Sequence, residues 1–219
     1  MIKAVIFDMD GLMIDSERVT FEGYQHVLAK ENLTMSEEKY KTLLGKTVKA
    51  VHELFKEDYG PQYDVDQIIK DVHAYIAQRF ETEGVPLKPG LVELLKYLKE
   101  NNYKTIIATS SHRNRVDLIV KQAQIDQYFD DSICGDEVTK GKPNPEVFLK
   151  ACQKLQVSPQ DALVLEDSES GINAAYNADI KVIGIPDMKY PEEKFVKMTY
   201  KIMDNLFQVK EFLEENNKQ

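Results

Sequence analysis

Two carboxylates, Asp8 and Asp10, follow an apolar, β-branched run near the start of the chain. The run from Ile2 to Phe7 predicts a buried strand, whose backbone hydrogen bonds would fix the position of the first polar residue after it. Side chains alternate along a strand, so a spacing of two places both carboxylates on one side. One could attack phosphorus as a nucleophile while the other gives and takes a proton. Carboxylates this close repel one another, which predicts a bound cation, and Gly11 permits a tight turn next to them.

A run of small hydroxyl residues, Thr109-Ser110-Ser111, follows a second apolar segment, residues 105–108. Backbone N–H groups that lead from a strand into a helix can cradle phosphate oxygens. The same residues also suit a helix N-cap, and both interpretations can hold together. His112 and Arg113 come directly afterwards, so they either touch a second anionic group of a substrate or form a solvated helix start.

A basic and proline-rich segment, residues 140–146, places Lys142 at the entrance of a predicted helix. A positive charge there could bind a transferring phosphoryl group and offset its repulsion from the carboxylates. A single lysine is usually a solvated surface charge, so Lys142 gains meaning only from the other clusters.

A second acidic pair, Glu166-Asp167, ends the apolar segment 162–165. Mg²⁺ prefers hard oxygen ligands, so these carboxylates together with Asp8 and Asp10 form a candidate metal site. An acidic helix cap is the alternative interpretation. It does not explain why successive strands all end in polar clusters.

The elements that must position these clusters change in pattern along the chain. Helical spacing covers segments 17–31, 37–44, 47–58 and 66–82, whereas strands alternate with helices from Lys88 onward. This pattern predicts an α/β core domain, residues 1–14 and 86–219, with a doubly wound parallel sheet. Residues 15–85 form an inserted α-helical cap domain that could act as a lid. Sites in such sheets form at the carboxyl ends of the strands, where the clusters fall.

The order and spacing of these clusters resemble the haloacid dehalogenase superfamily, in its branch of small phosphatases and β-phosphoglucomutase-like enzymes with a helical cap. The resemblance runs from Phe7 to Gly171. It implies a Mg²⁺-dependent hydrolase of small phosphate monoesters, with sugar phosphates as the expected substrates, acting through an aspartyl-phosphate. The roles it implies are nucleophile for Asp8, general acid and base for Asp10, phosphate ligand for Thr109, motif lysine for Lys142, and metal carboxylates for Glu166 and Asp167.

A phosphosugar mutase is the nearest alternative. In β-phosphoglucomutases an arginine lies shortly after the cap glycine and a histidine lies just beyond the first motif. This chain has Lys46 after Gly45 in place of the arginine, and Thr20 in place of the histidine. A lysine lacks the bidentate fork of arginine, which weakens the mutase interpretation. Glu17 is a candidate substrate-binding residue of the cap. A non-catalytic protein that binds a phosphate ligand is the alternative from another class.

Composition sets further limits. The chain has 219 residues, 42% of them hydrophobic, and a net charge of −9. This acidic balance argues against nucleic acid as a partner, and no apolar run is long enough to span a membrane. The opening residues lead directly into the first strand and leave no room for a secretory leader, so we expect a cytoplasmic protein. Nothing demands a second chain, so we expect a monomer whose partner is a small phosphorylated metabolite.

Overall fold

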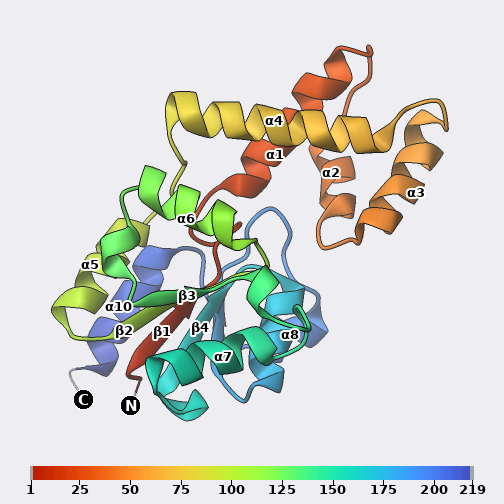
Figure 1. Ribbon diagram of the computed structural model, residues 1–219. Helices are drawn as coiled ribbons and strands as arrows, with labels where there is room; N and C mark the ends of the chain where they lie inside the picture. The colour runs from red at the N-terminus through yellow and green to blue at the C-terminus, as the bar shows by residue number, and fades with distance from the viewer. Residues whose placement is uncertain (1, 218–219) are drawn as a thin grey trace. The chain divides into compact units, whose positions relative to one another are not determined.

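The computed structural model describes residues 2–217 (Figure 1). The chain divides into two compact units, one made of Met1–Asp15 and Val85–Gln219 and the other of Ser16–Gly84. The predicted boundaries lie one residue away from these. The first unit carries the sheet, and the second consists of helices.

A six-stranded sheet with strand order β3-β2-β1-β4-β5-β6 forms the centre of the first unit, and every neighbouring pair is parallel. The chain builds outward from β1 on one side and then returns to build outward from β4, which is the doubly wound arrangement. The predicted fold class is thus confirmed. The strands are β1 (Ala4–Phe7), β2 (Lys104–Ala108), β3 (Asp131–Ile133), β4 (Ala162–Glu166), β5 (Lys181–Gly184) and β6 (Lys201–Ile202).

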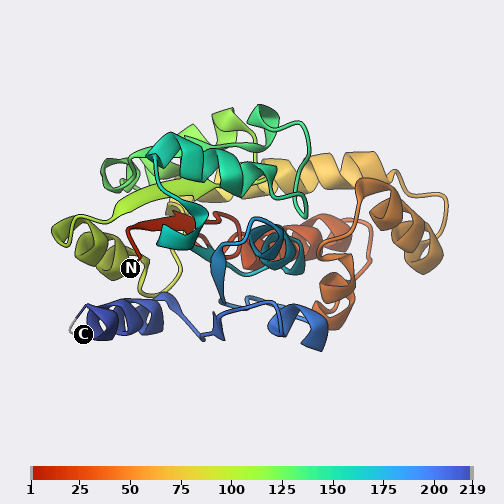
Figure 2. The same ribbon diagram turned by 90° about the horizontal axis from the view of Figure 1, so that it is seen from below.

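Helices cover both faces of this sheet (Figure 2). Ala4 and Ile6 of β1 pack with α7 (Glu146–Leu155) and α8 (Glu169–Asn177) in one apolar cluster. On the opposite face, α5 (Leu91–Glu100) and α10 (Leu206–Asn216) lie side by side. Side chains alternate between the two faces along a strand, and all four residues of β1 are buried. Both faces of the sheet are therefore covered at β1. The remaining helical elements are α6 (Arg113–Gln122), α9 (Glu193–Val196), and the short 3₁₀ turns η1 (Asp126–Tyr128), η2 (Gly135–Glu137) and η3 (Pro159–Asp161).

The second unit contains four helices among its residues, in the segments that the sequence predicts. They are α1 (Ser16–Ala29), α2 (Glu37–Leu43), α3 (Val48–Tyr59) and α4 (Val65–Glu83). Ser36, Thr47 and Asp64 cap α2, α3 and α4 through their side chains. Gly23 allows α1 to approach α4, since a Cβ atom there would lie 3.1 Å from Val72 Cγ1.

Within residues 2–217, none of the helices combines the length and the apolar character that crossing a membrane requires.

Candidate active site

Three predicted site residues lie at the carboxyl edge of the sheet, at the ends of neighbouring strands. Asp8 follows β1, Thr109 follows β2, and Glu166 ends β4. Backbone hydrogen bonds continue past the strands: the Asp8 N–H donates to the Leu165 carbonyl at 3.0 Å. The Thr109 N–H likewise donates to the Ile133 carbonyl at 3.0 Å. Sheet hydrogen bonding therefore holds these residues where the strand order reverses, the usual place for a ligand in this architecture.

Lys142 reaches this edge from the segment that precedes α7. Its Nζ donates to Asp8 Oδ1 at 2.5 Å, to Glu166 Oε1 at 2.6 Å and to the Ala108 carbonyl at 3.1 Å. An ammonium group has three hydrogens, so these acceptors engage all of its donors. The sequence predicts that Lys142 binds a phosphoryl group. The structure shows it joining two buried carboxylates, and a direct contact with a phosphoryl group stays a prediction.

Burial sets the electrostatics of this cluster. Burial raises the pKa of Asp8, Lys142 opposes that rise, and the negative charge of Glu166 adds to it. Burial also disfavours the charged form of Lys142, but Asp8 and Glu166 together hold its pKa above the ordinary value. Lys142 is therefore a fixed positive charge between two acidic groups.

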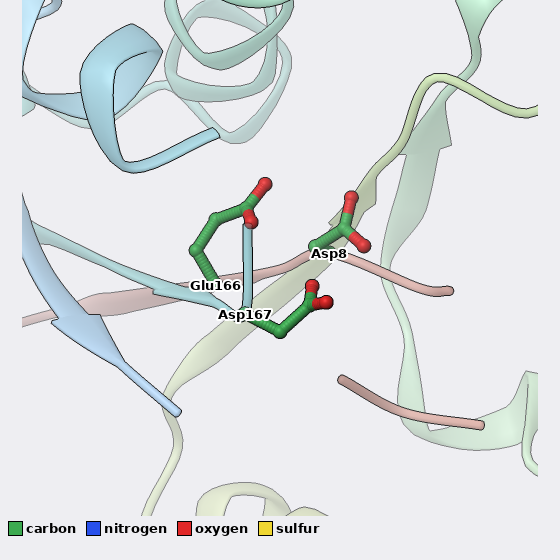
Figure 3. Close-up of side chains that lie close together, drawn as sticks. All are labelled: Asp8, Glu166 and Asp167. Atoms are coloured by element: carbon green, nitrogen blue, oxygen red, sulfur yellow. The ribbon is translucent and has the colours of Figure 1, made fainter. Parts of the chain in front are cut away.

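Three carboxylates lie close enough together to share a cation (Figure 3). One oxygen from each of Asp8, Glu166 and Asp167 lies within 4.8 Å of the others. Both carboxylate oxygens of Glu166 already have protein partners. Its Oε1 accepts from Lys142, and its Oε2 accepts both the N–H and the hydroxyl of Ser168 at 2.9 Å. The carboxylates of Asp8 and Asp167 are thus the best placed of the three to bind a cation.

The donor set and its surroundings fit Mg²⁺. All three groups offer hard oxygen atoms, which this ion prefers. Gly11 adopts a φ of +81°, and a Cβ atom there would lie 2.3 Å from Asp167 Oδ2. A larger residue would therefore push against one of the candidate ligands.

Asp10 does not belong to this convergent group, although the sequence predicts it as a metal ligand. Its Oδ2 accepts the Ser111 hydroxyl at 2.7 Å, and its Oδ1 accepts Arg115 Nη2 at 2.6 Å. Arg115 is not among the site residues that the sequence motifs predict. The available signal is its place in the first turn of the helix after the hydroxyl cluster, a turn that begins at the carboxyl edge of the sheet.

The hydroxyl cluster, residues 109–111, is fixed by hydrogen bonds and close packing within the protein. Two of the N–H groups predicted to cradle phosphate have protein partners, because Thr109 donates to Ile133 and Ser111 donates to Thr109 Oγ1 at 3.1 Å. Gly135 approaches closely: a Cβ atom there would lie 2.2 Å from the Ser110 carbonyl oxygen. The cluster is therefore rigid, and fewer of its donors face a ligand than the sequence suggests.

For Arg113 and His112 the sequence leaves two alternatives open, and a contact with a second substrate anion stays a prediction. The Arg113 guanidinium bonds to Ser132 and Glu137, and its N–H donates to Asp136 Oδ1 at 3.0 Å. These contacts attach the start of α6 to β3 and to the segment that follows it. The His112 side chain is 81% exposed, which agrees with a solvated helix start.

Glu17 lies in the second unit, where its Oε2 accepts the Tyr40 hydroxyl at 2.5 Å. Burial, and then the charge of Glu17, raise the pKa of Tyr40, so the phenol stays a donor. A substrate contact of Glu17 stays a prediction.

A family model described as haloacid dehalogenase-like hydrolase matches residues 5–185. The chain belongs to this family. A phosphorylated carbohydrates phosphatase from Thermotoga maritima is 32% identical over 181 residues, which cover 83% of each chain. The (DL)-glycerol-3-phosphatase 2 of Arabidopsis thaliana is 31% identical over 194 residues, 85% of this chain and 80% of that one. The predicted family and the predicted hydrolase class are confirmed.

A solved structure from Thermotoga maritima, provisionally assigned as a β-phosphoglucomutase, shares this fold. It has a TM-score of 0.83 and 27% identity over 98% of this chain and 99% of that one. The likeness extends over both units, so the helical insertion in an α/β core is a feature that the two chains share.

Proposed function

We propose that this protein is a Mg²⁺-dependent phosphatase that hydrolyses small phosphate monoesters, sugar phosphates included, by forming an aspartyl-phosphate on Asp8. The observation that carries this proposal is the position of Asp8, with one oxygen on Lys142 and two further carboxylates beside it. A carboxylate held in this way has a fixed oxygen for attack and a cation that limits its repulsion from a phosphate dianion.

In the first step, the second carboxylate oxygen of Asp8 bonds to phosphorus while the bond from phosphorus to the substrate alcohol breaks. Asp10 gives a proton to the leaving oxygen. In the second step, a water oxygen bonds to phosphorus, its proton passes to Asp10, and the bond to Asp8 breaks. The products are the alcohol and inorganic phosphate, and both aspartates return to their starting states.

Asp8 and Asp167 would hold Mg²⁺, with Glu166 close enough to take part. When bound, this ion supplies positive charge that offsets the repulsion between the carboxylates and the phosphate oxygens. Glu166 and Ser168 act indirectly, because they fix Lys142 and hence the orientation of Asp8.

The relatives support hydrolysis over phosphoryl transfer within a sugar. The Thermotoga and Arabidopsis relatives are named as phosphatases, for phosphorylated carbohydrates and for glycerol 3-phosphate. The solved structure assigned as a mutase shares the fold, but this chain has Lys46 and Thr20 where the mutase pattern has an arginine and a histidine. We therefore place phosphatase ahead of mutase. The cytoplasmic location and the monomeric state stay predictions.

The test is phosphate release from a panel of sugar phosphates, glycerol phosphate and nucleotides, with and without Mg²⁺. β-Glucose 1-phosphate is included with a coupled assay for glucose 6-phosphate. We expect free phosphate that disappears when Mg²⁺ is removed. Glucose 6-phosphate with little free phosphate would establish the mutase instead. Ligand binding without any turnover would favour the non-catalytic alternative.

A further inference from the structure

Both carboxylate oxygens of Asp10 accept hydrogen bonds from one short segment of the chain, residues 111–115. The Ser111 hydroxyl donates to its Oδ2 at 2.7 Å, and Arg115 Nη2 donates to its Oδ1 at 2.6 Å. Each carboxylate oxygen thus has its own donor, and the two donors lie four residues apart. A carboxylate bonded through both oxygens is restricted in rotation about its side-chain torsions.

The segment that provides these donors is itself fixed. The Gly135 N–H donates to the Ser111 carbonyl at 2.8 Å, and Arg113 binds Ser132 and Glu137. Val116 of α6 is buried. Arg115 therefore projects from an anchored helical turn rather than from a mobile loop, which suits a group that must orient another side chain.

The pair is also accessible enough to adjust during a reaction. The side chains of Arg115 and Asp10 are 38% and 28% exposed. An ion pair in such surroundings contributes little to stability, so its main effect is on orientation. The buried pair of Lys142 and Asp8, by contrast, is 4% and 10% exposed.

We infer that Arg115 is a positioning residue, which together with Ser111 aims the Asp10 carboxylate at the water that hydrolyses the aspartyl-phosphate. This inference rests on the proposed function. In that step the water oxygen bonds to phosphorus, the bond from phosphorus to Asp8 breaks, and the proton goes to Asp10. A base must be correctly placed to accept that proton, and loss of placement slows this step.

The test uses p-nitrophenyl phosphate, whose leaving group departs without needing a proton, so the first step does not depend on Asp10. For Arg115→Ala we expect kcat to fall about tenfold or more, with KM falling in parallel. Their ratio should stay within about twofold of the original value, because kcat/KM reports the step that forms the aspartyl-phosphate. The phosphorylated enzyme should accumulate, visible as a nitrophenol burst and by mass spectrometry after rapid quenching. Arg115→Lys should restore part of kcat.

The matched control is Lys121→Ala, which removes an exposed positive charge from the same helix. It should leave kcat, KM and the phosphorylated fraction unchanged. The inference is overturned if kcat/KM of Arg115→Ala falls as much as kcat, or if this variant behaves like Lys121→Ala. An inactive original protein would instead defeat the proposed function itself, so the two failures are distinguishable.

Discussion

Asp8 and Asp10 are two residues apart, yet the structure places their carboxylates in different surroundings. Asp8, Lys142 and Glu166 form a buried cluster, in which the side chain of Lys142 is 4% exposed and that of Glu166 is fully buried. Asp10, Ser111 and Arg115 form an outer cluster, in which Arg115 is 38% exposed. Burial makes the first cluster important for both stability and charge, whereas the second mainly sets orientation.

The largest expected effect concerns the buried cluster. Asp8→Asn removes the proposed nucleophile while keeping the size of the side chain, so phosphate release should fall by about 10³-fold or more. The fold should be retained, as circular dichroism would show. Unchanged activity in this variant would defeat the mechanism.

Removing the positive charge of Lys142 from the buried cluster should lower the free energy of unfolding. Lys142→Ala leaves the carboxylates of Asp8 and Glu166 buried without compensation, and we expect the free energy of unfolding to fall by about 3–5 kcal/mol at neutral pH. The loss should shrink in acid, where protonation removes the uncompensated charges. Urea unfolding measures both effects. The control is Lys140→Ala, an exposed lysine nearby, which should change stability by less than about 0.5 kcal/mol.

The close packing around Glu166 gives a second test of the buried cluster. A Cβ atom at Gly171 would lie 1.7 Å from Glu166 Oε1, whereas one at Gly141 would meet nothing within 4 Å. Gly171→Ala should therefore displace the carboxylate and lower the free energy of unfolding by about 1–3 kcal/mol. Gly141→Ala should have almost no effect. Equal losses in the two variants would show that the buried cluster tolerates movement.

The binding of Mg²⁺ should depend on pH through Asp8. Burial raises the pKa of this group, so protons compete with the cation closer to neutral pH than for an ordinary aspartate. Protonation removes a ligand charge, and the affinity should therefore weaken as the pH falls, approaching about tenfold per pH unit. Calorimetric titration at about pH 8 and about pH 6 measures this. An affinity that does not change over this range contradicts the role of Asp8 as a ligand.

The smallest stability effect belongs to the outer cluster. Arg115→Ala removes a half-exposed ion pair and should lower the free energy of unfolding by less than about 1 kcal/mol, despite its effect on turnover. Urea unfolding of Arg115→Ala and Lys142→Ala under the same conditions compares the two losses of stability directly. A loss as large as that of Lys142→Ala would remove the distinction between the two clusters.

The sequence predicts the elements well because their signals are local. Apolar runs predict β1, β2 and β4, and the polar residues that follow these runs mark the carboxyl edge of the sheet. The contacts are less predictable, because Lys142 meets Asp8 across 134 positions of the chain. The choice between Arg113 and Arg115 shows the same limit. Both lie in one helical turn, and only the packing of α6 on β3 and the segment after it decides which guanidinium reaches Asp10.

The most direct measurement of the central claim is the mass of the peptide that contains Asp8, taken after rapid quenching of the reaction with a phosphate monoester and Mg²⁺. We expect one added phosphoryl group on Asp8, and none in Asp8→Asn. Turnover with no phosphoryl group on Asp8, or with the group on another residue, would contradict it.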